Sequence, residues 1–276
     1  MIKKILCPTD FSAASMNATE FAAKLAQQTG SILTLLNVQK IHISDGVSLF
    51  AMAERESVRE AKISSDSLKE MCDDINKSFK ISCNHEVIPS ISAFENVVAE
   101  ESDKYNLIVV GTNGSDSMYQ FYFGSHSFRI AKKTVCPVLV VPETCNYKGI
   151  SNIVFASDYK PGEDFSLHQL TGIAEAFGSN IRILHVNQKD NEESKNDFDS
   201  FCNIIKMEFK ENEKITFVRI INEKIIDAIK DEIKKSDVDL IVVNMKEHGY
   251  LYRVFHKDLI ENLTSVAETP VLIYHY

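Results

Sequence analysis

The sequence has no apolar run long enough to cross a bilayer, and none of its six cysteines belongs to a CxxC pair. A transmembrane helix needs about 20 consecutive apolar residues, so a membrane-spanning protein is not expected. The N-terminus has two lysines and then only a few apolar residues, too few for the core of a signal peptide. Cysteines and histidines also lack the spacing of zinc ligands, and we therefore expect reduced thiols in a cytoplasmic protein.

Basic residues are also fewer than acidic ones. The chain has 30 Lys and Arg against 39 Asp and Glu, which gives a net charge of −9 and a pI near 5.4. Nucleic acids and anionic membranes select basic surfaces, and no cluster of Lys and Arg with interleaved aromatic residues overrides the overall sign. The composition is typical of a soluble, globular protein, and neither nucleic acid nor membrane is an expected partner.

Known catalytic motifs are absent too. The sequence contains no GxxxxGK[ST] loop, no GxGxxG after a strand and no GxSxG elbow. An efficient kinase or ATPase needs a carboxylate that holds Mg²⁺ and a positioned nucleophile, and Asp10 is the sole candidate for the first role. We predict no catalytic residue.

What the sequence does contain is a series of short apolar runs that alternate with helical patterns. Predicted strands cover 2–7, 32–38, 81–88, 107–110 and 138–141, and predicted helices cover 11–28, 51–79, 91–105 and a stretch ending near 134. The segment 41–50 is expected to be a loop, and Ser64 and Ser65 are candidate breakers of the long helix. The alternation predicts an α/β fold with a parallel sheet covered by helices on both faces.

The second half of the chain repeats the first. The matched segments are 153–158 with 5–10, 239–243 with 106–110 and 269–273 with 136–140, and Gly178 and Val186 recur at the places of Gly30 and Val38. Such a repeat indicates a tandem duplication. We predict domains 1–144 and 149–276, joined by a short polar linker that makes the halves pack closely.

The stretch 111–127 is rich in glycine and serine and follows the apolar run at 107–110. Gly111 and Gly114 are followed by Gly124, Ser125 and Ser127 at the start of a predicted helix. A strand, a glycine loop and a helix start present backbone N–H groups to an anion. Two interpretations stay open here: a cradle for nucleotide phosphates, or an ordinary loop that caps a helix.

The repeat provides an internal control for this loop. In the second half, Asn244, Glu247, Lys257 and Asp258 stand at the positions of Gly111, Gly114, Gly124 and Ser125. Carboxylates repel a polyphosphate, so the second half is not expected to bind nucleotide in the same way.

Three segments together resemble the universal stress protein family of the UspA type. They are the strand end Cys7-Pro8-Thr9-Asp10-Phe11-Ser12, the loop Gly111-x-x-Gly114-x9-Gly124-Ser125 and the closing strand Pro137-Val138-Leu139-Val140-Val141. The resemblance covers the whole chain, as two tandem domains. It implies, in each half, an open five-stranded parallel sheet of order 3-2-1-4-5 with the ligand at the carboxyl ends of the strands. The implied ligand is ATP or another adenine nucleotide, with or without Mg²⁺.

The resemblance also implies which residues hold this ligand. Asp10 would contact the adenosine part, with Pro8 and Thr9 shaping the pocket, and Val38 would offer backbone groups to the adenine. The residues implied for ribose and phosphates are Gly111, Asn113, Gly114, Gly124, Ser125, His126 and Ser127. His126 and Asn113 depart from the usual pattern, although neither change removes a backbone donor. A structural alternative for Asp10 is a carboxylate at a helix N-terminus, because Asp158 recurs in the second half.

The resulting hypothesis is an ATP-binding stress-response protein with one nucleotide in its first domain. The second domain would be a degenerate partner in an intramolecular pseudo-dimer formed through the final strands, and a homodimer is also allowed. Binding would order the glycine loop for an unidentified protein partner. The alternatives are a slow ATP hydrolase, a nucleotide-independent interaction module, and a second-half cleft for another small molecule or a metal near His248 and His256.

Overall fold

The computed structural model describes residues 2–41, 47–112, 125–159, 163–210, 212–245 and 269–275. Among them the chain divides into two compact units, with the boundary between Tyr147 and Lys148. We call these units the first and the second domain and describe each by itself. The limits 1–144 and 149–276 remain predictions.

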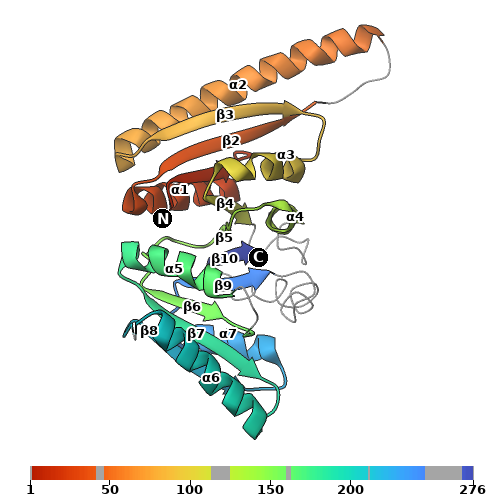
Figure 1. Cartoon of the computed structure of the whole chain (residues 1–276). Helices are drawn as coiled ribbons and strands as arrows, with labels where there is room; N and C mark the ends of the chain where they lie inside the picture. Colours follow the sequence, from red (N-terminus) through yellow and green to blue (C-terminus); the bar gives the residue numbers. More distant parts are fainter. Residues whose placement is uncertain are drawn as a thin grey trace. The chain divides into compact units, whose positions relative to one another are not determined.

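The first domain is an open parallel sheet of five strands in the order β3-β2-β1-β4-β5 (Figure 1). Its elements are β1 (Lys4–Pro8), α1 (Ala13–Thr29), β2 (Ile32–Lys40), α2 (Val47–Phe79), β3 (Cys83–Ser90), α3 (Phe94–Glu101), a 3₁₀ turn (Ser102–Lys104), β4 (Leu107–Thr112), α4 (Ser125–Lys133) and β5 (Val138–Pro142). Helix α1 packs on α2 and helix α3 packs on α4. Right-handed crossovers place these two pairs on opposite faces of the sheet. The predicted α/β fold and strand order are confirmed.

The second domain has the same topology, with the strand order β8-β7-β6-β9-β10. Its elements are β6 (Asn152–Ala156), α5 (Glu163–Phe177), β7 (Asn180–Asn187), α6 (Glu192–Glu208), β8 (Ile215–Ile221), α7 (Ile225–Lys235), β9 (Leu240–Met245) and β10 (Val271–His275). Strand β6 begins 148 positions after β1, at 152 against 4, and β9 begins 133 positions after β4, at 240 against 107. The repeat seen in the sequence is therefore a repeat of strand positions.

Helix α1 follows its sequence pattern closely. The Ser12 side chain caps its N-terminus by accepting the N–H of Ser15, and Gly30 ends it with a φ of 67°. Gly178, which follows α5, has a φ of 68°, and this left-handed conformation is one that glycine adopts without strain. Its apolar residues at helical spacing form one buried face: Ala14, Ala18, Phe21, Ala22, Leu25 and Ala26.

Helix α2 differs from its prediction in three respects. It begins at Val47, inside the predicted loop, and it runs through Ser64 and Ser65 without a break. The apolar residues of its helical pattern are only partly buried, because Val58 and Ile63 are 66% and 56% exposed. A helix of 33 residues is about 50 Å long, whereas the eight-residue strand β3 spans about 26 Å. The helix therefore continues beyond the strand it packs on, and its far part has no sheet to cover (Figure 1).

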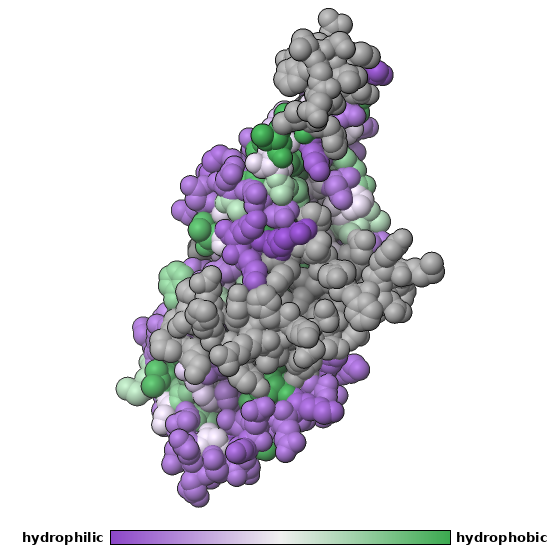
Figure 2. Space-filling model, turned by 90° about the vertical axis from the view of Figure 1, so that its right-hand side faces the viewer, coloured by the Kyte–Doolittle hydropathy of each residue, from purple (hydrophilic) through white to green (hydrophobic). Residues whose placement is uncertain are grey.

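The core lies between the sheet and the helices of each domain. Almost every residue of β1, β4, β5, β6 and β9 is buried, as expected for parallel strands covered on both faces. On the face shown in Figure 2, the described surface is mostly hydrophilic, with scattered hydrophobic residues. No helix in the described ranges has the length and apolarity needed to span a membrane.

Candidate functional site

Five of the residues predicted to bind a ligand lie at or near the ends of β1, β2 and β4, namely Pro8, Thr9, Asp10, Val38 and Gly111. In the first domain the chain leaves β1 for β2 on one side, while β4 lies on the other side. The strand order therefore reverses between β1 and β4. Pro8 is the last residue of β1, and Gly111 and Thr112 end β4. In open α/β sheets, ligands bind at the carboxyl ends of the strands beside this reversal.

Thr9 is the centre of a buried hydrogen-bond network just after β1. Its N–H donates to the Leu36 carbonyl at 2.8 Å, and its own carbonyl accepts from Nδ2 of Asn37 at 2.8 Å. Its hydroxyl lies 3.0 Å from the hydroxyl of Ser15 in the first turn of α1. These bonds fix the turn that leads from β1 into α1, and the partners of Thr9 are residues that the sequence did not mark as site residues.

Asp10 lies at the surface of this turn. Its Oδ1 accepts the N–H of Ser12 at 3.0 Å. Burial alone would raise the pKa of the Asp10 carboxyl, but hydrogen bonds from Ser12 and Ser15 together outweigh it, and the pKa is lowered. The carboxylate is therefore charged at neutral pH, and it accepts from the backbone of Ser12, the residue that caps α1.

Val38 is half-buried in β2, two residues beyond the last register pair of β1, which is Pro8 with Leu36. Backbone groups in a parallel strand point alternately to its two neighbours. Leu36 directs its carbonyl toward β1, since it accepts from Thr9, and Val38 therefore directs its N–H and C=O to the same side. Because β1 has ended there, these groups face the space beyond that strand.

Gly111 is placed where no side chain fits. A Cβ atom on it would lie 2.2 Å from the carbonyl oxygen of Ala14, in the backbone of α1. The buried hydroxyl of Ser127, in the first turn of α4, donates to the Gly111 carbonyl at 3.1 Å. This bond joins the end of β4 to the start of α4.

Several predicted residues cannot be placed at the site. Asn113, Gly114 and Gly124 lie outside the described residues, as do Glu247, His248, His256, Lys257 and Asp258 of the second half. Ser125 and His126 are the first two residues of α4. Within the described ranges, no group of three or more His, Cys, Asp or Glu side chains lies close enough to hold a metal ion.

The second domain makes the same bonds after β6 with different residues. The N–H of Ser157 donates to the Leu184 carbonyl at 2.9 Å, and Nδ1 of His185 donates to the Ser157 carbonyl at 2.7 Å. The Ser157 hydroxyl is bonded to Glu163. These residues stand 148 positions after Thr9, Leu36, Asn37 and Ser15. Polar residues at equal offsets were the signal in the sequence that could have revealed this network.

Two titratable groups of the second network are neutral at pH 7. Burial raises the pKa of the Glu163 carboxyl to about 8, and a hydrogen bond with Asp158 adds to this effect. Burial also lowers the pKa of His185. Its neutral ring donates from Nδ1, accepts from Asn187 at Nε2, and stacks on the Tyr159 ring with centroids 3.7 Å apart.

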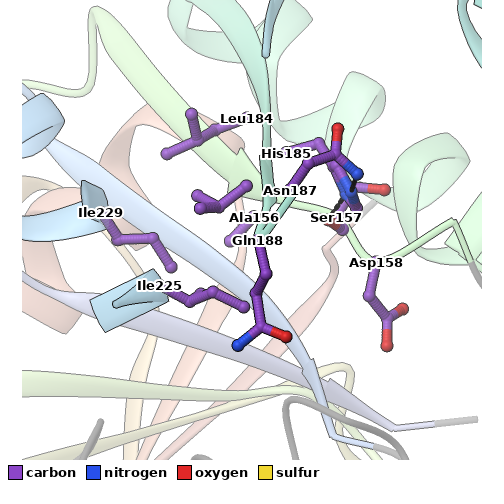
Figure 3. A pocket seen from close by; sticks show the side chains of 10 residues that line it. Ala156, Ser157, Asp158, Leu184, His185, Asn187, Gln188, Ile225 and Ile229 are labelled. Atoms are coloured by element: carbon purple, nitrogen blue, oxygen red, sulfur yellow. Dashed lines mark hydrogen bonds between the residues drawn. The ribbon is translucent and has the colours of Figure 1, made fainter. Parts of the chain in front are cut away.

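A cavity of about 280 Å³ lies at the carboxyl ends of β6 and β7. Its lining comprises Ala156, Ser157, Asp158, Leu184, His185, Val186, Asn187, Gln188, Ile225 and Ile229. In Figure 3, Ile225 and Ile229 of α7 lie toward Ala156 and Leu184, and the Asp158 carboxylate lies on the side away from α7. The second domain thus keeps a small pocket with an apolar wall at this end of its sheet.

The end of β9 in the second domain differs from the end of β4 in the first domain. Asn244 stands at the position of Gly111, near the end of β9, and its side chain is buried with 3% exposure. A side chain is therefore accommodated where the first domain has room for none.

The comparisons with known proteins agree with this fold. The sequence model of the universal stress protein family matches residues 1–142. A universal stress protein of Methanocaldococcus jannaschii is 30% identical over 148 residues, which are 51% of this chain and 82% of that protein.

Two crystal structures resemble the chain over nearly its whole length. A universal stress protein from Archaeoglobus fulgidus gives a TM-score of 0.75 at 16% identity, covering 99% of this chain and 98% of the other. A structure described as a universal stress protein from Pseudomonas aeruginosa gives a TM-score of 0.66 at 16% identity, covering 99% of this chain and 93% of the other. At these identities the structures support the fold alone. The match over residues 1–142 and the relative at 30% identity show that this chain belongs to the universal stress protein family.

Proposed function

We propose that the first domain binds one adenine nucleotide at the carboxyl ends of β1, β2 and β4, and that binding regulates a stress response. The observation that carries the proposal is the bond between Ser127 and the Gly111 carbonyl. It brings the first turn of α4 to the end of β4. The amide groups of this turn have no partners within the helix, and they lie where the strand order reverses between β1 and β4. A helix N-terminus at this place favours a phosphate group.

The other half of the proposed site would hold the base and the ribose. Val38 offers a donor and an acceptor side by side, which suits the edge of an adenine ring. Asp10 offers a charged carboxylate for a ribose hydroxyl. Gly111 supports the proposal less directly, because contact with Ala14 already requires a glycine there. Pro8 and Thr9 shape the turn between these groups.

We also propose that the second domain binds no nucleotide in this manner. Asn244 occupies the position of Gly111, and acidic residues stand in the sequence at the positions of Gly114 and Ser125. The 280 Å³ pocket favours a second candidate, namely a separate small molecule in this domain. The pairing of the two domains, a homodimer and the protein partner remain predictions from the family resemblance.

The first experiment is a measurement of nucleotide stoichiometry. Nucleotide released by denaturing fresh protein is identified by chromatography, and ATP is then titrated into emptied protein by calorimetry. We expect one adenine nucleotide per chain. Asp10→Ala should weaken binding roughly 10- to 100-fold, as for the loss of a hydrogen bond to a charged group. Asp158→Ala, the same change 148 positions later, should leave the affinity unchanged.

The outcomes separate the alternatives. Two nucleotides per chain would refute the single site, and no nucleotide with no heat of binding would refute the proposal as a whole. Phosphate release that disappears in Asp10→Ala would favour the slow hydrolase. If a partner protein is found, unchanged partner binding by Gly124→Asp, which puts a carboxylate in the glycine loop, would favour a nucleotide-independent module.

A further inference from the structure

Two of the six cysteines lie in contact with each other. The Sγ atoms of Cys72, near the end of α2, and Cys83, the first residue of β3, are 2.9 Å apart. Both side chains are buried, with 3% and 7% exposure. The N–H of Cys83 donates to Oδ1 of Asn76 at 2.7 Å, which fixes the start of β3 against the last turns of α2.

The contact makes the two thiols chemically unequal. A hydrogen bond from Cys83 lowers the pKa of the Cys72 thiol, and the same bond, followed by burial, raises the pKa of Cys83. The Cys72 sulfur also lies 3.2 Å from the Asn84 carbonyl oxygen. Since the thiolate is the nucleophile in thiol chemistry, Cys72 is the residue expected to react first.

We propose that Cys72 and Cys83 form a reversible disulfide when a peroxide oxidises the protein. The Cys72 thiolate attacks one peroxide oxygen, the O–O bond breaks, and Cys72 becomes a sulfenic acid while hydrogen peroxide releases hydroxide, which takes up a proton to become water. The Cys83 sulfur then attacks the Cys72 sulfur, its proton leaves with the departing hydroxide as a second water, and the S–S bond forms. Two thiols and one hydrogen peroxide thus give one disulfide and two waters.

Little movement is needed for this reaction. A disulfide has sulfur atoms about 2.05 Å apart, so the pair must close by roughly 0.9 Å, which small rotations of the two side chains can supply. Strand β3 is at the edge of the five strands of its domain, and Ser82 and Asn84 beside Cys83 are exposed. The proposal requires that a small oxidant reach the pair at this edge of the sheet.

The position of the pair predicts what the disulfide would do. It would link α2 to the start of β3, whereas Val38 pairs with Ile88 near the other end of that strand. The link should therefore stabilise the first domain and leave the proposed nucleotide site unchanged. This inference does not depend on the proposed function.

The test uses the full chain, reduced and then treated with hydrogen peroxide. Thiol titration under denaturing conditions should fall from six to four per chain. Digestion without reductant should yield one linked peptide pair containing Cys72 and Cys83, lighter than the reduced peptides by two hydrogen atoms, and dithiothreitol should reverse the change. The melting temperature of the first domain should rise by at least about 4 °C on oxidation.

Matched variants make the result decisive. Cys72→Ala and Cys83→Ala should each abolish the linked peptide and the thermal shift, whereas Cys145→Ala should retain both. Six thiols that survive peroxide treatment, a linked pair of other cysteines, or a sulfinic acid on Cys72 in place of the disulfide would each overturn the proposal. If a variant does not fold, the peptide map of the unaltered chain still shows whether Cys72 and Cys83 are linked.

Discussion

The substitution Gly111→Ala should destabilise the first domain in the absence of any ligand. A Cβ at this position would lie 2.2 Å from the Ala14 carbonyl oxygen and 2.5 Å from its carbon, whereas real Cβ contacts are essentially never shorter than 3.0 Å. The obstacle is backbone in the first turn of α1, which cannot rotate away as a side chain could. Overpacking of this kind costs about 1–3 kcal/mol, and we expect the upper end because the helix start must move by about 0.8 Å.

Two other glycines serve as controls for this experiment. Gly30 has a φ of 67° with no atom within 4 Å of its virtual Cβ, so Gly30→Ala should cost about 1 kcal/mol through backbone strain alone. Gly172 lies in α5 with equally open space, so Gly172→Ala should stabilise its helix by up to about 1 kcal/mol.

Thermal unfolding of the nucleotide-free protein measures all three variants. For a domain of this size, about 3 kcal/mol corresponds to a shift of roughly 10 °C. The transition of the second domain should stay in place for Gly111→Ala and serve as an internal reference. If Gly111→Ala melts within about 2 °C of the unchanged protein, the contact with Ala14 does not determine the need for glycine, and the argument from its geometry is wrong.

Three further predictions concern the polar contacts at the ends of β1, β4 and β6. Because burial raises the pKa of Glu163 from 4.5 to about 8, the folded state binds the extra proton, and stability should fall as pH rises from about 4.5 to 8, by at most about 1.4 kcal/mol per pH unit. Denaturant titrations of Glu163→Gln at several pH values should lack this slope. Asn37→Leu should cost about 1–2 kcal/mol in urea unfolding because the Thr9 carbonyl loses its donor, whereas Asn37→His, which copies the second domain, should cost less. Ser127→Ala should lower the free energy of unfolding by about 1 kcal/mol through the bond to Gly111, and Ser127→Thr should restore part of it; equal stability of both variants would contradict the role of this bond.

The strands and the repeat were predictable because they depend on local pattern. The apolar runs that end at Pro8 and Val110 belong to buried parallel strands, and their recurrence at fixed offsets reproduces the strand positions of the second domain. The cap at Ser12 and the helix end at Gly30 also depend on local sequence, since both follow from backbone chemistry within one turn.

Features that depend on a distant surface could not be predicted in this way. The exposure of Val58 and Ile63 depends on where β3 ends, and the apolar pattern of a helix gives no information about the length of the strand it packs on. Likewise, Asn37 and Thr9 meet across two strands, and nothing in either segment alone indicates the contact. The predicted loop glycines Gly114 and Gly124 lie outside the described residues, so their role stays a prediction.

The exchange of residues in the two networks has a practical consequence. In the first domain the turn after its first strand is held by Thr9, Ser15 and Asn37, whose side chains do not titrate near neutral pH. In the second domain the same turn is held through Glu163, whose carboxyl has a pKa raised by burial to about 8. Acidity is therefore a means of telling two homologous units apart inside one polypeptide. Where calorimetry gives overlapping transitions, the one that moves with pH can be assigned to the C-terminal unit, and the two copies can be followed without being cut apart.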